Sequence, residues 1–129
     1  EESYLSRNLG WFEPTMQALG ALPAGSRVLM LWEPRSLYCE PLCTPDEVLD
    51  RWLVERHTPG LDGRTGAILR RWADQGFTHV LYYKLGAEFQ KAHAPHYQGD
   101  DWLALEQLLA GLEFQASFGD TYVLYRLVR

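Results

Sequence analysis

Residues 27–32 read Arg-Val-Leu-Met-Leu-Trp, a nearly continuous apolar run of strand length between turn-forming residues. Such a run is typical of a β-strand that is buried on both faces, as in a parallel sheet covered by helices. Residues 78–83, Thr-His-Val-Leu-Tyr-Tyr, form a second run of the same kind. The first run predicts the central strand of an α/β fold and the second run predicts a further strand, with the strand order left open.

Two helices are predicted between these strands. The first begins at Thr44, which is placed to cap a helix with Pro45 in its first turn and Glu47 in a capping-box position. Its expected buried residues are Val48, Leu49, Trp52 and Leu53. The second ends at Gly76, a residue suited to a left-handed helix stop, and its expected buried residues are Ile68, Leu69, Trp72 and Ala73. A connection filled by helices favours a right-handed parallel crossover.

Residues 1–22 are predicted to form a leading amphipathic helix. Apolar residues recur at helical spacing there, namely Leu5, Leu9, Phe12, Met16, Leu19 and Leu22. Pro14 leaves two alternatives: it begins a helix near Glu13, or it lies inside a longer helix that it kinks.

The C-terminal third is predicted as a loop, a helix and a hairpin. Residues 84–99 show little periodicity and read as a long loop. Asp100 or Asp101 is expected to cap the following helix. Residues 114–118 and 121–128 read as strands joined by Gly119-Asp120 in an antiparallel hairpin.

Together these elements predict a single α/β domain over residues 1–129. We expect a three-layer sandwich with a small, mostly parallel sheet and the C-terminal hairpin. The chain carries 12 Lys and Arg against 17 Asp and Glu, a net charge of -5, which argues against a nucleic-acid partner. No apolar run reaches the roughly 18 residues of a membrane span, and no basic segment of a signal peptide precedes the first helix.

Ligands of open α/β sheets bind outside the carboxyl ends of parallel strands. Arg35 follows the first predicted strand and Lys84 follows the second. If these strands are neighbours, both side chains lie at this edge and can face one anion. The alternative for Arg35 is an ion pair with Glu33 or Glu40.

Cysteines and histidines offer weaker candidates. Cys39 and Cys43 are the only cysteines, and their spacing suits either a disulfide or two free thiols, depending on the compartment. A zinc site would need two further ligands. His93 and His96 flank a proline and lack the helical presentation of zinc motifs, and His79 is best explained as a hydrogen-bonded structural histidine.

Motifs for catalysis and cofactor binding are missing from the sequence. Neither strand is followed by a Gly-x-Gly-x-x-Gly or Walker loop, and no Gly-x-Ser-x-Gly elbow occurs. We therefore expect no catalytic residues, no metal and no cofactor in this domain.

Four segments together resemble the soluble C-terminal domain of polytopic GT-C-type membrane glycosyltransferases. They are residues 32–39 with 43–46, Trp-Glu-Pro-Arg-Ser-Leu-Tyr-Cys and Cys-Thr-Pro-Asp; residues 76–81, Gly-Phe-Thr-His-Val-Leu; and residues 122–127, Tyr-Val-Leu-Tyr-Arg-Leu. The family includes protein mannosyltransferases and aminoarabinose transferases, which take sugars from lipid-phosphate-linked donors. The resemblance covers nearly the whole chain.

The resemblance implies a Rossmann-like accessory domain on the extracytoplasmic face of the membrane, anchored through the transmembrane part of the same polypeptide. The essential acidic residues would lie in that membrane part, residues 1–22 would lie near the membrane, and Cys39 and Cys43 would form a disulfide. Arg35, Tyr38 and Lys84 would then line a groove under residues 84–99 and contact a glycan acceptor or a lipid-phosphate head group. The alternative is a stand-alone α/β module that binds a ligand or a protein, with the first helix as a dimer face.

Overall fold

The computed structural model describes residues 2–33, 42–46, 51–58, 60, 64–93 and 97–128, and only the backbone of 2–9, 51 and 53. In chain order its elements are α1 (Glu2–Gly20), β1 (Val28–Leu31), β2 (Cys43–Thr44), α2 (Arg51–Arg56), α3 (Thr65–Asp74), β3 (His79–Tyr83), α4 (Lys84–His93), α5 (Gly99–Ala110), β4 (Glu113–Phe118) and β5 (Tyr122–Arg126). The α/β class predicted from the sequence is confirmed.

One five-stranded sheet has the order β2-β1-β3-β5-β4. β1 pairs in parallel with both β2 and β3, and the register of β1 against β3 begins with Val28 opposite His79. β5 runs antiparallel to β3 and to β4. The expectation of a mostly parallel sheet is therefore wrong, because the chain reverses at residues 119–121 and inserts β5 beside β3 in the opposite direction.

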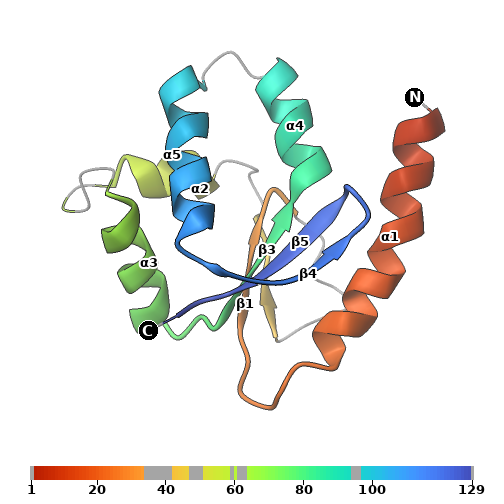
Figure 1. Ribbon diagram of the computed structural model, residues 1–129, viewed down its shortest axis with the longest axis horizontal. Coiled ribbons are helices and arrows are strands. Elements are labelled where there is room, and N and C mark those ends of the chain that lie inside the picture. The colour runs from red at the N-terminus through yellow and green to blue at the C-terminus, as the bar shows by residue number, and fades with distance from the viewer. Residues whose placement is uncertain are drawn as a thin grey trace.

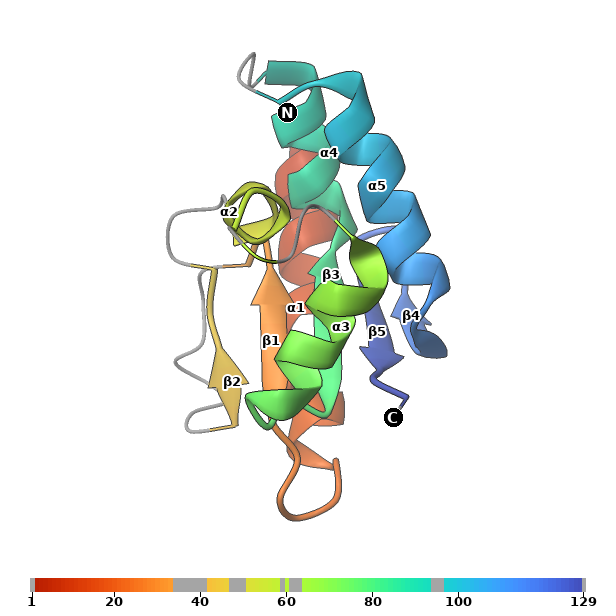
Figure 2. The same ribbon diagram turned by 90° about the vertical axis from the view of Figure 1, so that its left-hand side faces the viewer.

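Helices lie on both faces of this sheet. Figure 1 places α1 on one side of the strands, and Figure 2 shows the opposite face covered by α2, α3 and α5. The four residues of β1, Val28–Leu31, have no exposed surface. This agrees with the doubly buried central strand that the apolar run predicts.

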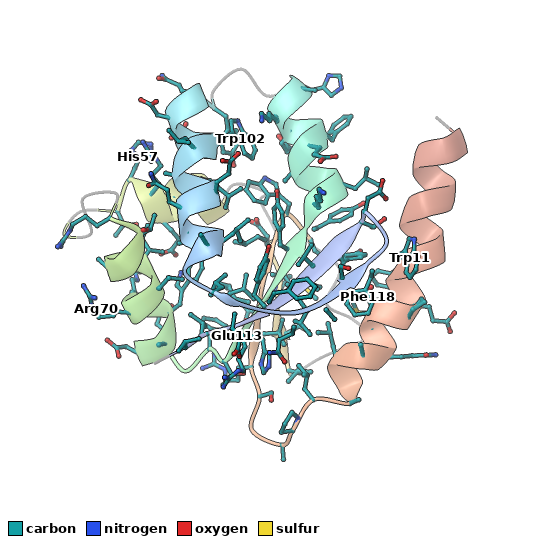
Figure 3. All side chains as sticks on the ribbon, viewed as in Figure 1. Trp11, His57, Arg70, Trp102, Glu113 and Phe118 are labelled. Atoms are coloured by element: carbon teal, nitrogen blue, oxygen red, sulfur yellow. The ribbon has the colours of Figure 1, made fainter. Side chains whose placement is uncertain are left out.

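α1 is one helix of 19 residues with Pro14 inside it, which decides between the two alternatives for this segment. Its C-terminal half contributes Met16 and Leu19 to the core. Trp11 lies against the turn between β4 and β5, where a Cβ at Gly119 would overlap its indole ring, and Figure 3 shows Trp11 beside Phe118. Gly119 has a positive φ of 61°, so this turn needs a glycine for both reasons.

Two predicted elements are wrong, each for its own reason. Thr44 does not cap a helix: it lies in β2, opposite Leu29 of β1. Residues 84–93, predicted as part of a loop, form α4, which continues directly from β3. Only Leu85 and Ala87 of α4 are buried, so the helix has too short an apolar stripe to show clear periodicity.

The start of α5 also differs from expectation. Gln98 is the N-cap of α5. The backbone N–H of Gln98 donates to the carboxylate of Asp101 at 2.8 Å, as part of a capping box. Asp101 is buried and also forms an ion pair with Arg56 at 2.7 Å, while its carbonyl accepts the indole N–H of Trp52. Asp101 is therefore the third residue of α5 and not its N-cap. Its ion pair with Arg56 and its carbonyl hydrogen bond with Trp52 also join α2 to α5. At the end of α3, Gly76 has a φ of 96° and is confirmed as a left-handed stop.

Candidate functional site

The carboxyl ends of β1 and β3 meet at one edge of the sheet, as the parallel register requires. Lys84 lies at this edge as the first residue of α4, and its backbone N–H donates to the carbonyl of Thr121 at 2.8 Å. Arg35 and Tyr38 lie outside the described residues, so only the position of Lys84 among the three predicted ligand-binding residues is established.

The end of β1 has an unusual backbone conformation. Trp32 has a positive φ of 64°, a left-handed conformation that is costly for a bulky residue. The carboxylate of Asp46 accepts the Trp32 N–H at 2.8 Å, and the Asp46 N–H donates to the Glu33 carbonyl at 2.9 Å. Since Asp46 is buried, these two bonds clamp the strand end in a dry environment. Strained backbone of this kind is frequent at functional sites.

An aromatic cluster covers this strand end. The Trp32 ring stacks on Trp102 at 5.4 Å between ring centroids and meets Tyr82 edge-on at 5.9 Å. Tyr97 completes the cluster, with its ring 4.8 Å from that of Trp102. Trp102 points from α5 toward α4 in Figure 3. The cluster joins β1, β3 and α5 into a rigid base at the carboxyl edge.

Glu33 is fully buried beside this cluster. Its carboxylate accepts a hydrogen bond from the hydroxyl of Tyr122, whose ring stacks on Tyr83 at 4.9 Å. This bond joins the end of β1 to β5. The alternative pairing of Glu33 with Arg35 falls outside the described residues.

A groove of about 210 Å³ lies between α4 and α5 above the end of β3. Its polar lining comes from Tyr82, Lys84, Glu88, Lys91 and Glu106, and its apolar lining from Ala87, Trp102, Leu105 and Leu109. Burial raises the pKa of Tyr82, and the negative charge of Glu88 raises it further, so its phenol stays neutral and can donate a hydrogen bond. Aromatic surface with a few convergent polar groups is typical of small-molecule sites.

Sequence reasoning identified Lys84 but missed the rest of this groove. A signal was present, because Lys84, Glu88 and Lys91 are four and three residues apart, a spacing that places them on one helix face. Because residues 84–93 were predicted as a loop, this helical spacing was not used. The contributions of Tyr82 and Trp102 depend on how α5 packs over β3, which no local pattern encodes.

The histidine candidates form no metal site in the described part of the chain. His79 Nδ1 lies 2.8 Å from the hydroxyl of Thr78, in agreement with a structural histidine. His93 packs its ring on Phe89 and His96 lies outside the described residues. Within the described ranges, no three His, Cys, Asp or Glu residues gather as a metal site.

The predicted disulfide stays a prediction. Cys43 is buried at the start of β2. Cys39 lies outside the described residues, so the structure gives no geometry for the Cys39–Cys43 pair.

Comparison of the chain with protein families, with curated proteins and with solved structures gives no match. Among the described residues, no helix has both the length and the apolar character needed to cross a membrane.

Proposed function

We propose that this chain is a non-catalytic accessory domain of a membrane glycosyltransferase that uses a lipid-phosphate-linked sugar donor. In this proposal the domain lies on the extracytoplasmic face, docks on the transmembrane part of the same polypeptide and assists acceptor binding. The observation that supports the proposal is the groove between α4 and α5, where Lys84 lies at the carboxyl edge of the sheet. Open α/β sheets bind their ligands at this edge.

The chemistry of the groove suits a sugar or an anionic head group. Lys84 and Lys91 supply cationic donors, while Glu88 and Glu106 supply acceptors for hydroxyl groups. The rings of Tyr82 and Trp102 offer apolar surface at its base. Mixed charges over an aromatic base recognise a neutral or singly charged polar molecule better than a polyanion.

The resemblance to the soluble domains of GT-C-type enzymes supports the same assignment. The parallel set β2-β1-β3 with helices on both faces suits a Rossmann-like three-layer sandwich, as the resemblance implies. In this proposal the groove binds and positions the acceptor, and the membrane part of the enzyme cleaves the bond. The Cys39–Cys43 disulfide belongs to the same proposal, since an extracytoplasmic location is oxidising.

A stand-alone binding module is the second candidate, and one observation favours it. Met16 and Leu19 of α1 are buried against the chain's own sheet, as a free module requires for the apolar stripe of this helix. In a transferase tail, part of the stripe would face the missing membrane portion. Both candidate functions use the groove between α4 and α5. They differ in whether a transmembrane part precedes α1 in the polypeptide.

Substitution of Lys84 by alanine in the full-length polypeptide is expected to raise the KM for the acceptor about tenfold. This is the loss of one charge-assisted hydrogen bond, about 1.4 kcal/mol. The value of kcat should change little, because Lys84 binds the acceptor in this account and does not take part in bond cleavage. Steady-state kinetics with the purified enzyme measures both quantities.

Arg70→Ala is the matched control, since Arg70 is an exposed cation on α3 that does not line the groove. It should leave KM unchanged, and both variants should keep the melting temperature of the native protein. A folded Lys84→Ala variant with an unchanged KM would remove the groove from acceptor binding.

A further inference from the structure

A second cavity lies at the opposite edge of the sheet, where β1 and β3 begin. Its volume is about 540 Å³. The connection from α1 to β1, the turn between α3 and β3, and the end of β5 enclose it. Apolar lining comes from Leu22, Pro23, Ala73, Phe77 and Leu127, and polar lining from Ser26, Thr78, His79, Gln115 and Arg126. Nothing in the proposed function uses this cavity.

The polar side of the cavity is built by strand register. His79 of β3 lies opposite Arg126 of β5, and Arg126 lies opposite Glu113 of β4. Directly opposed residues on neighbouring strands point to the same face of a sheet, so the three side chains form one row. Glu113, labelled in Figure 3, marks the outer end of this row.

The guanidinium of Arg126 keeps N–H donors available for a ligand. Its Nε donates to Glu113 Oε1 at 2.6 Å, and Gln115 Nε2 donates to the same oxygen at 3.3 Å. Among the described residues, Glu113 is the one hydrogen-bond partner of the Arg126 side chain. The two terminal nitrogens of the guanidinium therefore present a planar N–H edge that carboxylates can accept in bidentate fashion.

His79 adds a buried, uncharged polar group at the inner end of the row. Its side chain is almost inaccessible, and its Nδ1 is engaged with the Thr78 hydroxyl. Burial lowers the pKa of His79, and the positive charge of Arg126 lowers it further, so the imidazole is neutral at neutral pH. The row thus carries one cation, Arg126, and one partly compensating anion, Glu113.

We propose that this cavity binds a small amphipathic monocarboxylate, with its carboxylate on the terminal nitrogens of Arg126 and its apolar body between Leu22, Phe77 and Leu127. Arg126 is the one cation among the described residues that line the cavity, and it sets the charge of the ligand. A dianionic phosphate would meet one guanidinium and be repelled by Glu113, whereas a carboxylate matches the guanidinium edge. The apolar walls exclude ligands that are polar throughout.

The probe for this site is 3-phenylpropanoate, titrated into the 129-residue chain and followed by amide chemical shifts in ¹H–¹⁵N NMR spectra. We expect saturable shifts at residues 76–79 and at Leu127. The uncharged alcohol 3-phenylpropan-1-ol has the same apolar body, and we expect it to bind at least about tenfold more weakly, because it cannot form the charge-assisted pair.

Two substitutions on the same ion pair separate ligand binding from a merely structural role. Arg126→Gln should weaken binding of the acid about tenfold, and Glu113→Gln, which removes the competing negative charge, should strengthen it severalfold. Both disrupt the same surface ion pair, so a purely structural role would move the two affinities together. The amide spectrum of each variant reports whether it is folded.

Three outcomes would overturn the proposal. They are the absence of saturable shifts at millimolar acid, equal affinity for acid and alcohol, and unchanged affinity in a folded Arg126→Gln variant. Shifts confined to the groove between α4 and α5 would also contradict it, because the acid would then bind at the carboxyl edge of the sheet.

Discussion

Replacement of Trp32 by alanine is expected to lower the free energy of unfolding by about 3–5 kcal/mol, the usual cost of removing a large aromatic side chain from a core. The Trp32 side chain is 2% exposed and stacks on Trp102. Its loss would open a cavity at the centre of the aromatic cluster, beneath the groove. Urea unfolding followed by far-UV circular dichroism measures the change.

Trp32→Gly is the matched variant. It removes the same indole, but glycine adopts a φ of 64° without strain. In ordinary strand or helix positions glycine is less stable than alanine by about 0.5–1 kcal/mol. Here we expect the reverse order, with the glycine variant more stable than the alanine variant by about 1 kcal/mol. A glycine variant less stable than the alanine variant would contradict the left-handed conformation of Trp32.

Asp46→Ala is expected to cost about 3 kcal/mol of unfolding free energy, nearly as much as the loss of the Trp32 side chain. The substitution removes a buried carboxylate acceptor and leaves the N–H of Trp32 buried without its partner at 2.8 Å. The end of β1 would then lose the clamp that holds its left-handed residue. The same urea titration gives the result.

Asp46→Asn tests whether the acceptor or the charge is responsible. Asparagine keeps a side-chain carbonyl oxygen that can accept the Trp32 N–H. We expect it to lose less than half as much stability as the alanine variant. Equal losses in the two variants would mean that the negative charge of Asp46, and not the hydrogen bond to Trp32, stabilises the strand end.

The central part of the fold could be predicted because local patterns encode it. The run at residues 27–32 contains β1 and the run at residues 78–83 contains β3. The two strands are parallel, as expected, and the structure shows that they are neighbours. Gly76 ends the turn before β3 with its positive φ. A strand buried on both faces needs a continuous apolar run, and a positive φ favours a glycine. Both features can be recognised directly in the sequence.

The missed elements are those that tertiary contacts define. β2 has only two residues, Cys43 and Thr44, too few for any periodicity, and it exists because it pairs with β1. The insertion of β5 beside β3 made the sheet mixed, and no local pattern specifies which strand a C-terminal segment joins.

The same limit applies to the candidate site. Lys84 could be predicted because it directly follows a strand whose direction was predicted. Asp46 and Trp32 are 14 residues apart, and Tyr122 and Glu33 are 89 residues apart, so neither pair has a signature in one sequence. Such long-range polar pairs become visible only once the sheet order is known.

The most direct test of the central claim, that this chain is the accessory domain of a membrane glycosyltransferase, is to read the source coding sequence upstream of Glu1. The transferase proposal predicts roughly eight or more apolar runs of about 18 or more residues in the same reading frame, with an acidic residue in the first non-cytoplasmic loop. A start codon directly before the codon for Glu1 would contradict the transferase proposal and leave the stand-alone binding module.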